Sequence, residues 1–316
     1  MRAVVWDGRK LRLVSDAPPP IRREGTALVR VRTAGICSTD LQILDGYLGF
    51  RGVLGHEFVG EVIDGVDDWN GRRVVGEINF SCGRCPTCQA SRRRHCPARS
   101  VLGILGADGA FADVLRIPEA NLHLVPDEID DRTAVFVEPL AAAFEAAEQT
   151  RGYAGGRSIV LGAGKLGLLV AQVLARRGDR VEVVCRNDRA RGVVESLTLT
   201  PVDPRSATRG ADLVVDATGS EDGLAFALEL VRPLGALVLK STVAARYALD
   251  LAPLVINEIT VIGSRCGPFR PAIEAFARRE IAVAPLVDAV VPLDGALEAF
   301  ERASLPGALK VLIEAV

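Results

Sequence analysis

The 316-residue sequence is poor in net charge, in histidine and in uninterrupted apolar runs. A formal net charge of −2 provides no long-range attraction for nucleic acid or for an anionic membrane, so neither partner is expected. The longest apolar stretch, residues 158–175, contains Lys165 and three glycines, which argues against a membrane-spanning helix. The N-terminal residues show no apolar run of signal-peptide length, and a soluble cytoplasmic protein is therefore predicted.

The sequence also lacks a cysteine pattern typical of disulfides. Its seven cysteines are an odd number, and Cys37, Cys185 and Cys266 are isolated from the others. Apolar residues make up 49% of the chain, which is enough for a large core and favours more than one domain. We find no internal repeat and no low-complexity linker.

The other four cysteines are concentrated in the segment SCGRCPTCQASRRRHC. Their spacing is C-x2-C-x2-C-x7-C, and they are Cys82, Cys85, Cys88 and Cys96. Zinc is bound by four thiolates at tetrahedral corners, and short x2 spacings let a turn direct successive thiolates inward. The spacing predicts a closed structural zinc site, which has no open position for chemistry. His95 could replace Cys96 as a ligand, and reduced thiols or a redox site are the alternatives.

A second set of candidate ligands is dispersed along the chain. Cys37 lies in AGICSTDLQ, and His56 precedes Glu57 in VLGHEFVGEV. A lone cysteine or histidine is usually a core residue, but the chain has only three histidines, and this one lies beside an acidic residue between glycines. Glu138 lies in the apolar run VFVEPLAAAFEA, where a carboxylate should be paired or bound to a metal.

The segment RSIVLGAGKLGLLVAQVLARRGDRVEVVC predicts a strand over Ser158–Leu161, a glycine turn, a helix and a second strand. Its glycines fit G-x-G-x-x-G: the first permits the tight turn, the second admits the pyrophosphate, and the third lets helix and strand pack closely. The pyrophosphate would lie at the helix N-terminus, where free N–H groups favour anions. The predicted residues of this site are Gly162, Gly164, Lys165, Leu166 and Gly167.

Taken together, these motifs resemble the zinc-dependent medium-chain dehydrogenase/reductase family, which includes alcohol, sorbitol, threonine and glucose dehydrogenases. The resemblance covers essentially the whole chain through motifs that occur in the family's order: GICSTD, GHEFVGEV, the four-cysteine segment, GADGAFADVLRIPEANLHLVP, VEPLA, VLGAGKLGLL and VVDATGS. It implies an α/β fold in which a Rossmann doubly wound parallel sheet is joined to a GroES-like, mainly β catalytic domain.

The resemblance also implies how the chain is divided. Residues 1–126 would form the catalytic domain with the structural zinc lobe, residues 127–264 the NAD(P)-binding domain, and residues 265–316 a return to the catalytic domain. The apolar runs ADLVVDATG, GALVLKST and ITVIGSR are expected to be parallel strands buried on both faces. Thr218 would end one of them at the carboxyl edge, where such sheets bind ligands.

For the active site, the resemblance implies a catalytic zinc held by Cys37, His56 and a carboxylate. Glu138 occupies the family's third-ligand position, and Glu57 is the alternative, since some relatives bind zinc through the residue after the histidine. Asp40 would hold His56 in the required tautomer. Thr39 occupies the position of a proton relay, whereas Gln42 stands where alcohol dehydrogenases end that relay with a histidine.

The nucleotide specificity depends on the end of the second strand of the dinucleotide domain. The family's ribose-binding position is Cys185, which cannot accept two ribose hydrogen bonds, whereas the adjacent Arg186 and Asn187 could contact a 2′-phosphate. NADP is therefore predicted as the preferred cofactor, with NAD as the alternative through Asp188.

The predicted function is hydride transfer between an alcohol (a polyol, a sugar or another secondary alcohol) and NADP, with two Zn2+ ions per chain. The alternatives are a zinc-free quinone or enone reductase of the same superfamily and a non-enzymatic dinucleotide-binding protein. Relatives form homodimers or homotetramers, so one of these states is expected.

Overall fold

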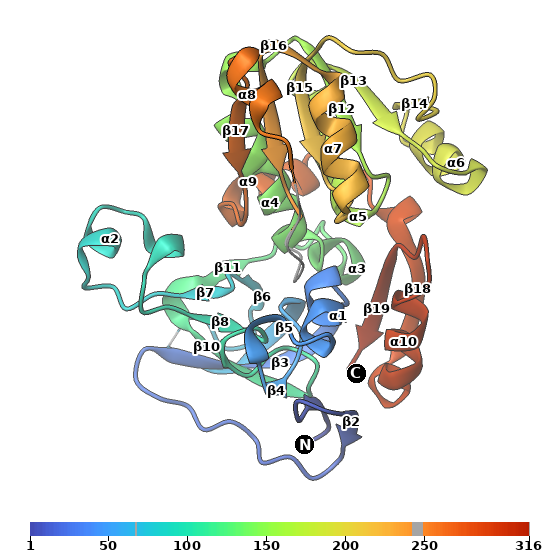
Figure 1. Ribbon diagram of the computed structural model, residues 1–316. Helices are drawn as coiled ribbons and strands as arrows, with labels where there is room; N and C mark the ends of the chain where they lie inside the picture. The colour runs from blue at the N-terminus through green and yellow to red at the C-terminus, as the bar shows by residue number, and fades with distance from the viewer. Residues whose placement is uncertain (67, 242–248, 316) are drawn as a thin grey trace. The chain divides into compact units, whose positions relative to one another are not determined.

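The structure, a computed structural model, describes residues 1–66, 68–241 and 249–315. The chain forms two compact units (Figure 1). The first contains Met1–Glu138 and Val287–Val316, and the second contains Pro139–Leu286. The second unit is thus inserted in the sequence of the first.

The boundaries of these units fall later than residues 126 and 264, where the sequence placed them. At the first boundary, helix α3 (Asp131–Ala134) packs on strands β3 and β5 and so belongs to the first unit. At the second, Gln172 of helix α5 exchanges hydrogen bonds with the backbone of Ala282, which keeps the segment before Val287 with the second unit.

The first unit is built on a seven-stranded, mainly antiparallel sheet in the order β11-β6-β5-β3-β19-β18, with β10 also paired to β3. Alternate residues of β3 are buried, as expected for a strand with one face on a core. The strands of this unit are β1 (Ala3–Trp6), β2 (Leu11–Val14), β3 (Thr26–Gly35), β4 (Gly52–Val53), β5 (Glu57–Asp64), β6 (Arg73–Gly76), β7 (Asn79–Phe80), β8 (Ser100–Leu102), β9 (Gly106–Ala107), β10 (Val114–Pro118), β11 (Leu122–Leu124), β18 (Val287–Pro292) and β19 (Lys310–Glu314). Its α-helices, besides α3, are α1 (Ser38–Leu44), α2 (Pro86–Gln89) and α10 (Ala296–Ala303).

The second unit contains a six-stranded parallel sheet in the order β14-β13-β12-β15-β16-β17. The strands are β12 (Arg157–Leu161), β13 (Arg180–Val184), β14 (Thr200–Val202), β15 (Ala211–Asp216), β16 (Val231–Leu239) and β17 (Thr260–Gly263). The helices are α4 (Val137–Gln149), which begins at the unit boundary, α5 (Lys165–Arg176), α6 (Asp188–Ser196), α7 (Glu221–Leu230), α8 (Ala252–Ile256) and α9 (Phe269–Ala277).

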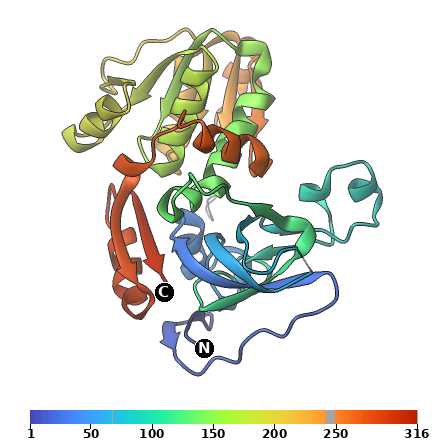
Figure 2. The same cartoon turned by 180° about the vertical axis from the view of Figure 1, so that it is seen from behind.

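Helices cover both faces of this sheet. Helix α7 packs on β15 and β16 and is nearest the viewer in Figure 1, whereas α5 packs on β12 and β13 on the face seen in Figure 2. This is the doubly wound arrangement that the sequence predicted, with β12 at the predicted strand.

One prediction about this sheet was wrong. The run ITVIGSR forms the parallel strand β17, but Thr260, Val261 and Gly263 are exposed. The cause is the position of β17 at the end of the sheet order, where it pairs with β16 on one side. An apolar sequence predicts a strand, but its burial depends on what packs against it.

Within the described ranges, no helix combines the length and apolar character that crossing a bilayer would require.

Candidate metal centres and dinucleotide site

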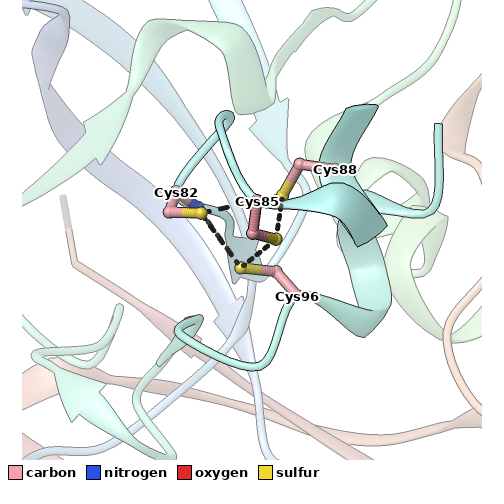
Figure 3. A group of neighbouring side chains, drawn as sticks. All are labelled: Cys82, Cys85, Cys88 and Cys96. Atoms are coloured by element: carbon pink, nitrogen blue, oxygen red, sulfur yellow. Dashed lines mark hydrogen bonds between the residues drawn. The ribbon is translucent and has the colours of Figure 1, made fainter. Parts of the chain in front are cut away.

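The four predicted structural ligands lie together in the first unit (Figure 3). We call this group the four-cysteine cluster. Cys82 follows β7, Cys85 precedes α2 as its N-cap, Cys88 lies within α2, and Cys96 follows a single 3-10 turn. Gly83 has a φ of +71°, the left-handed conformation that turns the chain between Cys82 and Cys85.

The sulfur positions of this cluster fit a tetrahedral ion. Four Sγ–Sγ distances are 3.5 Å (Cys82–Cys96 and Cys85–Cys88), 3.8 Å (Cys85–Cys96) and 4.0 Å (Cys82–Cys88). A tetrahedron with zinc–sulfur bonds of about 2.3 Å has edges of about 3.8 Å. A disulfide would need about 2.05 Å. The geometry therefore fits zinc, and His95, which is exposed, is not in the cluster.

The backbone of this lobe also favours thiolate formation. N–H groups of Arg84 and Cys85 lower the pKa of the Cys82 thiol to about 6. Burial raises the pKa of Cys88 to about 11, which reflects the cost of holding an anion there without a cation. A divalent ion would remove that cost, because the thiolate is the form that binds metal.

The second predicted group is assembled from separate elements of the first unit. Cys37 precedes α1 as its N-cap, His56 precedes β5, and Glu57 begins β5. One potential ligand atom from each lies within 4.8 Å of the others. We call these three residues the mixed cluster. His56 and Glu57 are 3% and 1% exposed, so the polar groups of both have little access to water.

Asp40, which is fully buried, connects the two segments that carry this cluster. Its Oδ2 accepts a hydrogen bond of 2.8 Å from Cys37 N, and its Oδ1 accepts one of 3.3 Å from Gly55 N. The same Oδ1 lies 3.3 Å from Nδ1 of His56. Nε2 is therefore the imidazole nitrogen that faces away from Asp40 and can serve as a ligand.

The electrostatics of the mixed cluster favour a cation. Burial lowers the pKa of His56, but the negative charges of Asp40 and Cys37 outweigh burial and hold that pKa well above its ordinary value. The carboxylate oxygen Oε1 of Glu57 is buried and has no hydrogen-bond partner among the described residues. A buried acceptor left unpaired is costly, so the donor set fits a metal ion that would satisfy it.

The other oxygen of Glu57 is bound by a residue that the sequence analysis missed. Lys310 of β19 is 1% exposed and donates to Oε2 of Glu57 in a buried ion pair. The sequence contained a signal for this residue. Lys310 lies in the apolar run ALKVLIEA, where a charged side chain should be paired, just as Glu138 should be paired in its own apolar run.

The remaining predicted catalytic residues are placed as follows. Thr39 lies in α1 with its Oγ1 3.8 Å from Cys37 Sγ, and Gln42 lies one turn further along the same helix. Glu138 lies at the start of α4 and is not part of the mixed cluster, whose carboxylate is Glu57.

The predicted glycine turn joins β12 to α5 in the second unit. Gly162 has a φ of +101°, and Gly164 is the N-cap of α5, so Lys165 and Leu166 form the first turn of that helix. A Cβ on Gly167 would lie 1.9 Å from the carbonyl oxygen of Gly162. These positions fit the three roles expected of a dinucleotide-binding turn.

The predicted ribose-binding residues follow the neighbouring strand β13. Cys185 is buried, whereas Arg186 and Asn187 are exposed. Asn187 caps α6, because its Oδ1 accepts a hydrogen bond of 2.8 Å from Ala190 N. Thr218, after β15, donates through both N and Oγ1 to Asp216, so its side chain holds the turn at this edge.

Comparisons with known proteins agree with this architecture. Residues 23–127 match the alcohol dehydrogenase GroES-like domain, and residues 131–315 match the glucose dehydrogenase C-terminus. The L-threonine 3-dehydrogenase of Streptomyces avermitilis is 33% identical over 78% of this chain and 79% of its own. The 2-dehydro-3-deoxy-L-galactonate 5-dehydrogenase of Pseudoalteromonas atlantica is 28% identical over 99% and 98%.

A solved structure of similar shape comes from Sinorhizobium meliloti. This protein, described as a zinc-binding dehydrogenase and bound to NADP, is 28% identical, with a TM-score of 0.89 over 99% of this chain and 98% of its own. The chain therefore belongs to the medium-chain dehydrogenase/reductase family with a GroES-like catalytic domain. It is an oxidoreductase of the alcohol dehydrogenase type, which confirms the class predicted from the sequence.

Proposed function

We propose that this protein is a zinc-dependent oxidoreductase that transfers hydride between NADP and a secondary alcohol of a polyol, sugar or sugar acid. The mixed cluster carries this proposal, because the thiol of half-buried Cys37 and the buried imidazole and carboxylate of His56 and Glu57 meet within 4.8 Å. The four-cysteine cluster would hold a second, structural zinc ion. The two relatives described above, which by name oxidise threonine at C3 and a galactonate derivative at C5, support a secondary alcohol as the substrate, and the second of them supports a sugar acid.

The residues of the first unit would divide the work as follows. Cys37, His56 and either Glu57 or Glu138 would hold the zinc ion, which lowers the pKa of a hydroxyl group bound to it. Asp40 orients His56 through Nδ1 and fixes Cys37 through its backbone N–H. Thr39 can accept the proton of the substrate hydroxyl and pass it towards solvent. Gln42 cannot titrate as the family's histidine does, so the relay would end in water.

The zinc assignment is tested by metal content and activity together. The native protein should contain two zinc ions per chain, one lost in Cys37→Ser and the other in Cys82→Ser. Alcohols, polyols and sugars are then screened with both cofactors by the absorbance of the reduced nicotinamide. A zinc-free quinone reductase or a non-enzymatic dinucleotide-binding protein would retain its full metal content in Cys37→Ser.

The choice between the two carboxylates is tested by substitution. Glu138→Ala should abolish turnover and leave cofactor binding intact if Glu138 is the third ligand. Normal turnover in Glu138→Ala, with loss of zinc in Glu57→Gln, would assign that role to Glu57.

The preference for NADP rests on the end of β13. Arg186 is exposed next to the N-terminus of α6, where a guanidinium group and free N–H groups both favour a phosphate. Cys185 is buried and offers no carboxylate to the ribose. Asp188, exposed in the first turn of α6, is the residue that would favour NAD.

Arg186→Ala tests this preference. Hydrogen bonds to charged groups contribute about 1.5–3 kcal/mol, so KM for NADP should rise about 10–100-fold with little change for NAD. Arg209→Ala is the matched control, because Arg209 is an exposed arginine before β15, at the amino edge of the same sheet. An equal loss of both cofactors in Arg186→Ala would refute a contact with the 2′-phosphate.

We also propose that two chains associate through β17. This edge strand exposes Val261, and the preceding helix α8 exposes Val255 and Ile256, each 77% accessible. At the opposite edge, β14 contains Pro201, which cannot donate to another strand. Antiparallel pairing of two β17 strands would extend the sheet and cover these apolar side chains.

Light scattering after size-exclusion chromatography tests the association. The native mass should be that of a dimer, or of a tetramer built from two such dimers, and Val261→Asp should lower it. Leu124→Asp, at an exposed apolar residue of the first unit, is the control and should leave the mass unchanged. A native monomer at micromolar concentration would refute the proposal. Four of the seven cysteines lie in a zinc-like cluster, which suits a reducing cytoplasm, where we place the protein.

A further inference from the structure

The buried lysine of the first unit has an unusual set of contacts. Nζ of Lys310 donates to Oε2 of Glu57 and lies 3.3 Å from the carbonyl oxygen of Ile36. It also lies 5.6 Å from the centroid of the Phe136 ring. Both partners of the ion pair are 1% exposed. A fully buried ion pair is an expensive way to gain stability, because both charges lose their water. A functional role of the pair would account for this cost.

Glu57 lies between this lysine and the mixed cluster. Oε2 belongs to the ion pair, whereas Oε1 has no hydrogen-bond partner among the described residues and Glu57 lies within 4.8 Å of the ligand atoms of Cys37 and His56. The carboxylate is therefore bound on one side and has an unsatisfied acceptor on the other.

The backbone at Gly35 lies close to both side chains of the pair. Gly35 ends β3 beside Glu57 in the sheet, and a Cβ there would lie 2.7 Å from Oε2 of Glu57 and 3.2 Å from Cδ of Lys310. The side chains thus pass over a glycine that any larger residue would obstruct.

We infer that Lys310 is a positioning residue that shares Glu57 with the metal centre and prevents it from becoming a permanent ligand. The inference rests on the proposed function. The Glu57 carboxylate already neutralises the buried ammonium group of Lys310, and both side chains are 1% exposed. It therefore binds a second cation less strongly than a carboxylate without such a partner does. Lys310 would thereby keep one position of the centre available to the substrate oxygen.

The test replaces the charge and measures the metal rather than only the activity. In Lys310→Met, Glu57 should become a full ligand, and release of the catalytic-site metal to a colorimetric chelator should slow by about tenfold or more. In the Co(II)-substituted protein, the visible absorption bands assigned to this site, those lost in Cys37→Ser, should shift. Lys310→Arg should remain close to the native protein in both measurements. In Lys310→Met, the decrease in kcat should be larger than the change in KM.

Two further variants separate positioning from other effects. In a Glu57→Gln background, Lys310→Met should change neither the release rate nor the spectrum, because the carboxylate through which it acts is gone. Lys240→Met is the matched control. Lys240 is also a buried lysine, with Nζ 2.9 Å from the carbonyl oxygens of Ala142 and Arg265 in the second unit, and its loss should lower stability without changing the cobalt spectrum.

Several outcomes overturn the inference. An unchanged release rate and spectrum in Lys310→Met would show a purely structural lysine. If Lys310→Met slows metal release and shifts the cobalt spectrum equally in the Glu57→Gln background, Lys310 acts by repelling the metal directly and not through Glu57. If Lys310→Met does not fold, Glu57→Gln alone decides. This variant should release the metal about tenfold faster than the native protein. A native release rate in Glu57→Gln would show that Glu57 does not contact the metal and would overturn the inference. Full metal retention in Cys37→Ser would refute the proposed function, and the inference with it.

Discussion

The four-cysteine cluster and the mixed cluster are both candidate zinc centres of the same unit, yet they are constructed in opposite ways. The four cysteines lie between Cys82 and Cys96 and are linked by tight turns and one short helix. The mixed cluster combines residues before α1 and at the start of β5, and Lys310, which binds its carboxylate, is 253 positions away from Glu57 in the sequence.

The two centres depend on the tertiary fold to different degrees. The four-cysteine cluster is fixed mainly by local turns, with four like ligands and no open position. The mixed cluster has unlike ligands, and each is held by another buried group: His56 by Asp40 and Glu57 by Lys310. A metal centre with four protein ligands stabilises the lobe around it. A centre whose ligands are held by other side chains and whose fourth position is open can bind a substrate and catalyse a reaction.

The largest expected effect comes from His56→Ala, which removes a proposed metal ligand of the mixed cluster. A metal ion contributes several kcal/mol to stabilising developing charge, so kcat/KM should fall by at least about 10³-fold. Steady-state kinetics and metal analysis measure the loss, and the zinc ion of the four-cysteine cluster should remain. A variant that retains native turnover would remove the mixed cluster from the reaction.

A smaller effect on activity is expected from Cys96→Ser in the four-cysteine cluster. The variant should lose the structural zinc ion and about 10 °C in Tm, because metal binding contributes to folding. Turnover per folded molecule should fall by less than about tenfold, since a closed site takes no part in the chemistry. If folded Cys96→Ser lost as much turnover as His56→Ala does, the four-cysteine cluster would also take part in catalysis.

Two glycine substitutions sharpen the comparison further. Gly35→Ala would place a Cβ 2.7 Å from Oε2 of Glu57 and 2.8 Å from Cγ1 of Val135, and overpacking of this kind costs about 1–3 kcal/mol. We expect kcat to fall because Glu57 and Lys310 are displaced. Urea unfolding and steady-state kinetics measure the two effects, and an unchanged kcat would show that the carboxylate need not be held in place.

The smallest effect is expected from Gly83→Ala in the four-cysteine cluster. No atom lies within 4 Å of the added Cβ, so the cost is the left-handed backbone at a φ of +71°, about 1 kcal/mol. Urea unfolding should show this loss, and kcat should not change. If Gly83→Ala lowered kcat more than Gly35→Ala does, the four-cysteine cluster and not the mixed cluster would be the centre that affects catalysis.

The parallel strands and the glycine turn of the second unit were predicted from apolar runs and local glycine positions. The mainly β first unit was expected only from the family resemblance. The exposure of β17 could not be predicted, since the composition of the strand does not record its position at the edge of the sheet. Arg186 and Asn187 were found from their distance after a strand, but the capping role of Asn187 became visible only with α6 in place.

The amino-acid sequence was sufficient to predict the four-cysteine cluster, because fifteen residues of chain cannot carry four thiols far apart. It also identified Cys37, His56, Glu57 and Glu138 as candidate ligands, but not which carboxylate joins the cluster. Only the tertiary structure brought Glu57 beside Cys37 and gave Lys310 to its other oxygen. Contacts between distant segments depend on how β3, β5 and β19 pair, and no local spacing records that pairing.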